Sequence, residues 1–376
     1  MKLTRILQNG LLCAGAILFS LVIAELALRW LMPVYDFRDR SLLFSSPVFK
    51  AYSGGSVRYQ PNQEIREVAI YNNKIEYDVL YDTNNYGFID SKPYRYEARP
   101  GKKYYAVVGD SFTAGVNAGS PWVPKLRNSS AGAEIYNFGV AATGFEHFFR
   151  LLHEMKGKVN ITHIVIVAIT DDFFRGYWHP LEMNGTLYFC SEGYGHARCL
   201  PVPVAGIVPV DASAEEVKKV SLQAYKEIRA RINEIKSANS LFAKMESTLY
   251  DDSALYYYSR VLFDTYSRSH KAASIEGAVS ALSQITADYP AAEVHLIHLP
   301  QKYEVKTKNY QIEIGRQITA LGINYYPALE KCSWSTDMFF LHDGHPNASG
   351  YENITRCVSG YLFGKENGAA ANSFKE

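Results

Sequence analysis

Short apolar runs recur along the chain, and the run that ends in Gly-Asp-Ser organises the others. It covers residues 104–109 (YYAVVG), a pattern typical of a strand buried on both faces of a parallel sheet. Ser111 therefore follows the C-terminal end of a strand, where open α/β sheets bind their ligands. Ser111 would act as a nucleophile if a base reaches it. The alternative is that Asp110 or Ser111 only caps the next helix.

Strand-like and helix-like patterns alternate through the rest of the chain. Further strands are predicted at 134–138, 163–169, 293–299 and 323–326, and helices at 121–127, 145–155, 214–237, 240–267, 275–289 and 309–321. Strands that alternate with helices predict an α/β fold, a parallel sheet with helices on both faces. Residues 77–82 alternate weakly, like an edge strand, and residues 177–209 read as irregular.

The N-terminal segment is apolar over residues 10–32, long enough to cross a bilayer, which takes about 20 residues. Lys2 and Arg5 precede it and favour a cytoplasmic N-terminus, which would place the rest of the chain outside the cytoplasm. The alternative is a cleaved signal peptide with its processing site at residues 22–24.

Composition and charge change this picture little. The 39 basic and 38 acidic residues balance, so the chain lacks the basic footprint of a nucleic-acid-binding protein. The length of 376 residues allows one large domain or two small ones.

Four of the five cysteines form two closely spaced pairs, Cys190 with Cys199 and Cys332 with Cys357. Export to an oxidising compartment would make both pairs disulfides. The second bridge would bracket the segment around His345. A zinc site is the alternative, but these spacings are not those of zinc knuckles.

A second segment that can carry chemistry lies near the C-terminus, at residues 343–347 (DGHPN). His345 would take the proton from Ser111, and Asp343 would fix the imidazole tautomer and stabilise its charged form. His342 is a competing base. The alternative is a simple turn before the last helix, with His345 merely packed.

Together, Gly-Asp-Ser at 109–111 and Asp-x-His-Pro-Asn at 343–347 resemble the blocks of the SGNH (GDSL-like) esterase and acyltransferase superfamily. The resemblance covers residues 104–362 around a large insertion. It implies a flavodoxin-like three-layer α/β/α sandwich and acyl transfer through a serine ester, with no cofactor. Because Pro-Asn follows His345 as in the family block, the resemblance favours His345 as the base.

The resemblance also implies an oxyanion hole, with two departures. The backbone N–H groups of Ser111 and of residue 142 would hold the oxyanion, and Ala142 replaces the usual glycine. The family's Asn-Asp pair is here Asp171-Asp172, and an ionised aspartate only accepts hydrogen bonds. Asp171 therefore cannot donate a side-chain hydrogen bond to the oxyanion. The alternative is that its side chain points elsewhere and that backbone N–H groups alone hold the oxyanion. Metal binding by this pair is a further alternative, but no histidine is near in sequence, so we expect no metal.

Two further features resemble membrane-anchored members of the superfamily. Glu25 and Arg29 form a Glu-x-x-x-Arg ending to the apolar segment, which favours an anchor. Residues 84–88 (NNYGF) precede the Gly-Asp-Ser block and are expected to pack beside the catalytic sheet, with a plain turn as the alternative.

The predicted organisation has six parts: a cytoplasmic N-terminus and transmembrane anchor (1–32), an exported lead-in (33–100), the first part of the SGNH core (101–176), a largely helical insertion (177–290), the second part of the core (291–364) and a flexible tail (365–376). The insertion is expected beside the active-site mouth, as a lid, a substrate platform, a docking surface or a plain helical layer.

Three functions fit these features. The first is an extracytoplasmic esterase that removes acyl groups, such as acetyl, from a glycan. The second is an O-acyltransferase that passes the acyl group to a glycan hydroxyl, fed by a membrane acyl-donor protein. The third is a non-catalytic SGNH domain that binds glycan or scaffolds an envelope complex.

Overall fold

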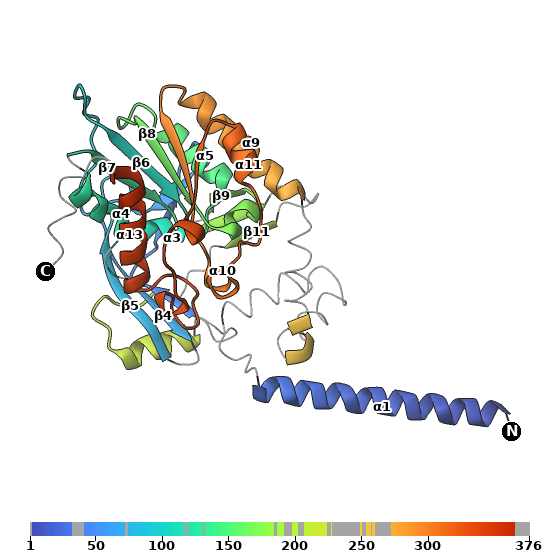
Figure 1. Cartoon of the computed structure of the whole chain (residues 1–376). Coiled ribbons are helices and arrows are strands. Elements are labelled where there is room, and N and C mark those ends of the chain that lie inside the picture. Colours follow the sequence, from blue (N-terminus) through green and yellow to red (C-terminus); the bar gives the residue numbers. More distant parts are fainter. Residues whose placement is uncertain are drawn as a thin grey trace, which may run out of the picture.

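The structure is a computed structural model (Figure 1). It describes residues 2–31, 41–71, 74–115, 117, 119, 121–130, 132–183, 186–191, 198–201, 207–223, 227, 249, 253–256, 258–259 and 272–364.

A five-stranded parallel sheet forms the centre of the protein, in the order β13-β12-β8-β6-β7. Its strands are β6 (Tyr104–Gly109), β7 (Glu134–Gly139), β8 (His163–Ala168), β12 (Glu293–His298) and β13 (Asn324–Pro327). Numbered along the chain, this is the flavodoxin-like order, and its direction reverses at β6. The residues of β6 are all buried, which explains why the strand reads as a continuous apolar run.

Helices cover both faces of this sheet (Figure 1). One layer contains α5 (Phe145–Met155), α9 (Ala272–Asp288) and α11 (Gly315–Ala320). The other contains α4 (Trp122–Lys125), α12 (Ala328–Lys331) and the long α13 (Ala348–Phe363). Shorter elements are α3 (Ser111–Ala114), α10 (Lys302–Thr307), and the 3₁₀ helices η2 (Leu126–Ser129), η3 (Thr170–Phe174) and η4 (Thr336–Met338). The predicted three-layer α/β/α fold is confirmed.

The lead-in forms its own antiparallel sheet beside this sandwich, in the order β1 (Ser41–Phe44), β4 (Glu64–Tyr71), β5 (Lys74–Asp82). A small hairpin, β2 (Phe49–Ala51) with β3 (Val57–Tyr59), accompanies it. The weak alternation at 77–82 belongs to the edge strand β5, as predicted. Both interpretations of residues 84–88 hold, since the Asn84 side chain closes a turn while Phe88 packs in the main core.

The prediction that residues 177–209 are irregular is wrong for the strands β9 (Trp178–Met183), β10 (Thr186–Ser191) and β11 (Arg198–Pro201), which form an antiparallel sheet. Each strand is short, and their pairing with one another, rather than an apolar run, defines them. The register sets Cys190 opposite Cys199, and Cys190 is disulfide-bonded. The Cys199 side chain lies outside the described part of the chain.

The helix predictions hold in part. Residues 214–223 and residue 227 are helical, while the other residues of 214–237 and most of 240–267 lie outside the described residues. The predicted helix at 309–321 is real only from Gly315 to Ala320. Before it, the Tyr310 ring stacks on His298 while Ile312 and Ile314 both pack in the main core, contacts that the segment makes without being helical. The helix α9 packs on α5, so this part of the predicted insertion belongs to the sandwich. The predicted tail also lies outside the described residues.

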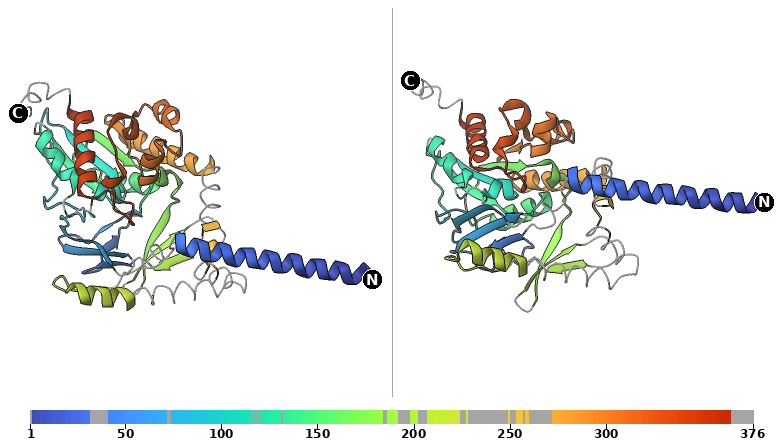
Figure 2. Two further views of the ribbon diagram at one scale, coloured as in Figure 1. Left: turned by 60° about the horizontal axis from the view of Figure 1, so that its bottom comes forward. Right: turned by 90° about the horizontal axis from the view of Figure 1, so that it is seen from below.

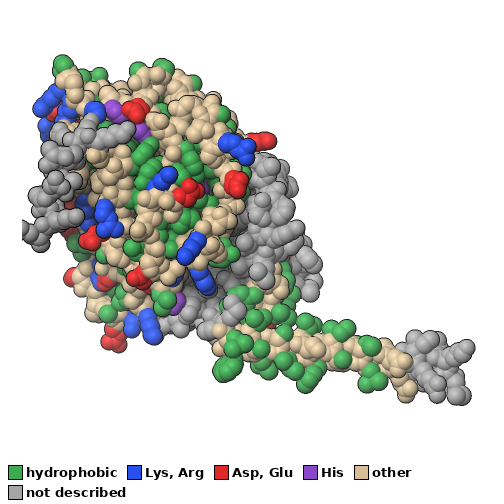
Figure 3. All heavy atoms as spheres, in the orientation of Figure 1, with side chains coloured by type: hydrophobic (Ala, Val, Ile, Leu, Met, Phe, Trp, Pro, Cys, Tyr) green, Lys and Arg blue, Asp and Glu red, His purple; other side chains and the backbone are tan. Residues whose placement is uncertain are grey.

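The N-terminal helix α1 (Lys2–Leu31) projects away from the sandwich (Figure 2). Within it, Gln8–Leu31 is long and apolar enough to cross a membrane and is unburied, a property that anchors and signal sequences share. Hydrophobic side chains line its described surface (Figure 3). The Glu25–Arg29 pair forms as expected, and Glu25 also accepts hydrogen bonds from the backbone N–H groups of Ala254 and Leu255.

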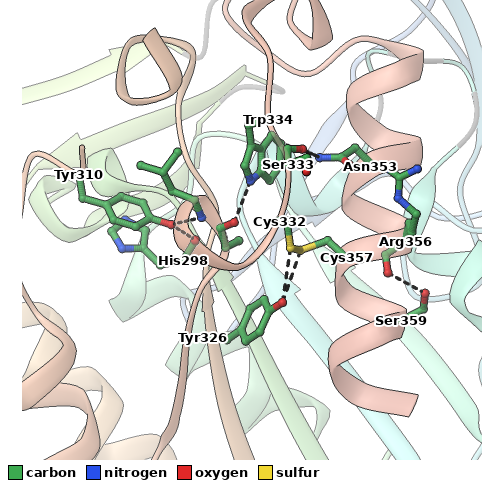
Figure 4. The surroundings of a disulfide bond; sticks show 12 residues. His298, Tyr310, Tyr326, Cys332, Ser333, Trp334, Asn353, Arg356, Cys357 and Ser359 are labelled. Carbon is green, nitrogen blue, oxygen red and sulfur yellow. Dashed lines mark hydrogen bonds between the residues drawn. A yellow bond between two sulfur atoms is a disulfide. The ribbon is translucent and has the colours of Figure 1, made fainter. Parts of the chain in front are cut away.

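A disulfide joins Cys332, after α12, to Cys357 on α13 (Figure 4). The same region is held by Trp334, whose indole donates to the Ala328 carbonyl, and by the Asn353 amide, which donates to the Ser333 carbonyl. The bridge therefore brackets the segment that carries His345.

We predict that the paired substitution Cys332→Ser and Cys357→Ser lowers the free energy of unfolding by about 3 kcal/mol, because the bridge closes a loop of 25 residues in the unfolded chain. Chemical unfolding of both proteins measures the loss. Cys13→Ser, which removes a free and exposed thiol, is the matched control. Free thiols at both positions in protein recovered from cells would contradict the bridge.

The lead-in sheet also buries a carboxyl group. Glu67 on β4 is 5% exposed and accepts hydrogen bonds from the hydroxyls of Tyr77 and Tyr81. Burial outweighs these bonds and raises the pKa of Glu67 to about 7.

Because folding raises the pKa of Glu67, its carboxyl ionises at a lower pH in the unfolded chain than in the folded protein. Glu67 therefore lowers the free energy of unfolding as the pH rises from about 4.5 to about 7. Glu67→Gln should abolish that loss. Between acid and mildly basic pH, the free energy of unfolding of the variant should therefore rise by about 3 kcal/mol relative to that of the wild type. Urea unfolding of both proteins at about pH 4 and about pH 8 measures the difference. An identical pH dependence in both proteins would contradict a raised pKa.

Candidate active site

The end of β6 presents Ser111 at the point where the strand order reverses. Asp110 caps α3, its carboxylate accepting the Phe112 N–H at 2.8 Å. A Cβ at Gly109 would lie 2.1 Å from Thr113 Oγ1 and 2.2 Å from the Val167 carbonyl oxygen. Only glycine therefore allows the tight strand-to-helix turn that places Ser111 there.

The structure brings the three sequence-predicted catalytic residues together. His345 Nε2 lies 2.8 Å from Ser111 Oγ, and His345 Nδ1 contacts Asp343 Oδ1. The side chain of Asp343 is fully buried, whereas that of His345 is 19% exposed. This chain of contacts is the arrangement in which a histidine accepts a serine proton while a carboxylate orients the imidazole.

The loop that carries His345 is fixed at both ends. The His345 carbonyl accepts the Phe340 N–H at 2.9 Å. The Asn347 side chain caps α13 by accepting the Gly350 N–H. A Cβ at Gly350 would lie 2.2 Å from the Met338 carbonyl oxygen, so the first turn of α13 packs closely on the loop.

The competing base His342 faces a different partner. Its backbone N–H and Nδ1 both contact the Glu76 carboxylate, at 3.0 and 2.7 Å, and its ring stacks on Tyr71. His345, rather than His342, is therefore the histidine beside Ser111.

Arg175, which sequence reasoning missed, ties the loops of the site together. Its Nη1 donates to Asp110 Oδ2, to the Thr143 carbonyl and to Asp172 Oδ1, at 2.8, 2.9 and 2.5 Å. Burial opposes its charge, but the two aspartates raise its pKa, which keeps Arg175 cationic. Burial and the neighbouring Asp110 raise the pKa of Asp172. Nothing in the local sequence distinguishes Arg175 from other arginines.

The expected oxyanion donors are present as backbone groups. Ala142 has φ of +62°, in the left-handed region that favours glycine, which explains why the family prefers glycine there. Among the residues that the structure describes, the N–H groups of Ser111 and Ala142 have no hydrogen-bond acceptor. Both remain available to a bound oxyanion.

The side chains of Asp171 and Asp172 contact different partners. Asp171 Oδ2 accepts a hydrogen bond from Gln301 Nε2 at 3.0 Å, whereas Asp172 binds Arg175 and caps the Ile169 N–H. No cluster of three or more potential metal ligands occurs within the described part of the chain. Both carboxylates are thus held by donors of the protein itself.

Comparison with known proteins assigns this fold and site. The family model for the GDSL-like lipase/acylhydrolase matches residues 105–358, from β6 into α13. A search of curated proteins found no match. The match covers most of the chain and includes both segments that meet at Ser111 and His345. The protein therefore belongs to the GDSL-like lipase/acylhydrolase (SGNH) family, whose members are esterases, acylhydrolases and acyltransferases.

Proposed function

We propose that the protein is an extracytoplasmic serine esterase that removes O-acyl groups, chiefly O-acetyl, from a glycan. The observation that carries this proposal is the contact of Ser111 Oγ with His345 Nε2, backed by the buried Asp343. A non-catalytic binding domain would have no need of this geometry.

The site has the groups for both halves of an acyl transfer. Ser111 Oγ attacks the ester carbonyl carbon while His345 Nε2 takes the serine proton, and the N–H groups of Ser111 and Ala142 hold the oxyanion. His345 then protonates the leaving alcohol oxygen, the C–O bond breaks and an acyl-serine remains. Attack by water, with His345 again as base, releases the carboxylic acid and restores Ser111.

Three features support an extracytoplasmic location. The apolar span Gln8–Leu31 suits a membrane anchor, and Lys2 and Arg5 precede it. The Cys332–Cys357 bridge suits an oxidising compartment. Acylated envelope polysaccharides are among the esters that an anchored enzyme would meet there.

One observation favours an O-acyltransferase as the second candidate. The carboxylate of Asp171 stands where relatives carry an asparagine donor, and it only accepts hydrogen bonds, as its contact with Gln301 illustrates. A negative charge near the oxyanion would slow acyl-enzyme formation. A slow hydrolase suits a transferase, for which attack by water on the acyl-enzyme is waste. The acyl group would then pass to a glycan hydroxyl, with a membrane acyl-donor protein as its source.

We predict that Ser111→Ala and His345→Ala each remove nearly all hydrolysis of an activated acetyl ester, and that the double variant is little worse, because the two residues act as a unit. Asp343→Asn should be less damaging. Steady-state rates of purified full-length protein measure this. Ser359→Ala, on α13, is the control and should match the wild type. Wild-type turnover by Ser111→Ala would exclude Ser111 as the nucleophile.

Asp171→Asn separates the two candidates. It keeps an oxygen for Gln301 and adds an N–H donor, and one such donor changes rates by roughly a hundredfold. If the protein is a transferase slowed by Asp171, wild-type hydrolysis is poor and Asp171→Asn is faster. Brisk wild-type hydrolysis that Asp171→Asn leaves unchanged or lowers would reject an inhibitory Asp171 and support the plain esterase.

A further inference from the structure

The buried carboxylate of Asp343 has a partner outside the matched family region. Tyr71, the last residue of β4, donates its hydroxyl hydrogen bond to Asp343 Oδ2 at 2.7 Å. Tyr71 is only 2% exposed, and the side chain of Asp343 is fully buried. The family match begins at residue 105, so this contact comes from the lead-in sheet.

The next strand makes a second contact with the same loop. Glu76 on β5 accepts the N–H of His342, the residue before Asp343, and contacts its Nδ1. The Tyr71 ring stacks on the His342 ring, with centroids 5.7 Å apart. Lys302 Nζ also donates to the carbonyls of Phe340 and Leu341, just before this loop's Asp343, each at 2.8 Å.

We propose that Tyr71 and Glu76 are positioning residues of the triad, and that the β4–β5 hairpin is an integral part of the active site. This inference rests on the proposed serine chemistry. The hydroxyl of Tyr71 donates to Asp343 Oδ2 and fixes the plane of that carboxylate, so that Asp343 Oδ1 faces His345 Nδ1. Glu76 fixes the backbone at residue 342 and keeps the competing imidazole away from Ser111.

The Tyr71 hydrogen bond also affects the charge that His345 senses. A donor on Asp343 disperses part of the carboxylate's negative charge, and its removal would stabilise the protonated imidazole more strongly. The loss of this bond should therefore change the pH dependence of the reaction. In the described part of the chain, the other charged or titratable groups near Asp343 and His345 include Glu67, Glu76, Asp110, Ser111, Lys302, His342 and Tyr351. Tyr71→Phe removes none of these groups.

Tyr71→Phe in the full-length protein tests the proposal. We expect kcat for an activated acetyl ester to fall about tenfold with KM unchanged, the scale of one hydrogen bond to a charged group. The acid limb of the pH–rate profile should move to higher pH. Tyr289→Phe is the matched control, because that hydroxyl donates to the Leu152 carbonyl, and it should match the wild type.

Glu76 supplies a second, independent variant. Glu76→Ala should lower kcat, and Glu76→Gln, which keeps an oxygen for the His342 N–H, should restore part of it. A merely structural role would lower thermal stability in both proteins without this rescue. Unchanged kcat in both Tyr71→Phe and Glu76→Ala would overturn the proposal, as would a fall in kcat that leaves the pH profile in place.

Proton NMR of the His345 Nδ1–H, which faces Asp343 Oδ1, separates this proposal from the proposed function. The resonance reports the hydrogen bond between His345 and Asp343 whether or not the enzyme turns over the chosen ester. A resonance that is shifted in Tyr71→Phe relative to the wild type supports the positioning role even if wild-type hydrolysis is undetectable. An unchanged resonance rejects the role even if the wild type is an active esterase.

Discussion

The hydrogen bond between Ser111 Oγ and His345 Nε2 is the interaction on which the chemistry of the site depends. It joins two residues that are 234 positions apart in the sequence and that only the fold brings together. The sheet order reverses at β6, which leaves the end of that strand open to the loop before α13. The fold thus determines where the serine lies, and the loop determines whether a base reaches it.

Three separate constraints hold that loop in place. The Cys332–Cys357 bridge and the Asn347 cap fasten it to α13. The lead-in sheet holds it from another side, through Tyr71 on Asp343 and Glu76 on His342. Arg175 then ties the cap of α3 to the loop of the Ala142 oxyanion donor and to η3. Fixed donors and acceptors of this kind lower the cost of reorganisation during acyl transfer.

Much of the fold was predictable because its signals are local. Strands β6, β7, β8 and β12 are buried on both faces, so each reads as an apolar run ending near its observed boundary. The Gly-Asp-Ser turn and the Asp-x-His spacing each need only a few neighbouring residues, and they identified Ser111, Asp343 and His345. The strands β9–β11 were missed because their pairing, not their composition, defines them.

The parts of the site that escaped prediction depend on distant contacts. Tyr71 and Asp343 are 272 positions apart, Glu76 and His342 are 266, and Arg175 and Asp110 are 65. A tyrosine at a strand end or an arginine after a short 3₁₀ helix has no local signature of such a role. The left-handed backbone of Ala142 was equally invisible, although the family's glycine at that position hinted at it.

The most direct test of this account is covalent labelling of the full-length protein with a serine-reactive phosphonate, followed by peptide mapping. The probe requires an activated serine and reports on the site without knowledge of the natural ester. The account predicts a single modified residue, Ser111, with labelling lost in His345→Ala. The absence of labelling at Ser111, or equal labelling in His345→Ala, would contradict it.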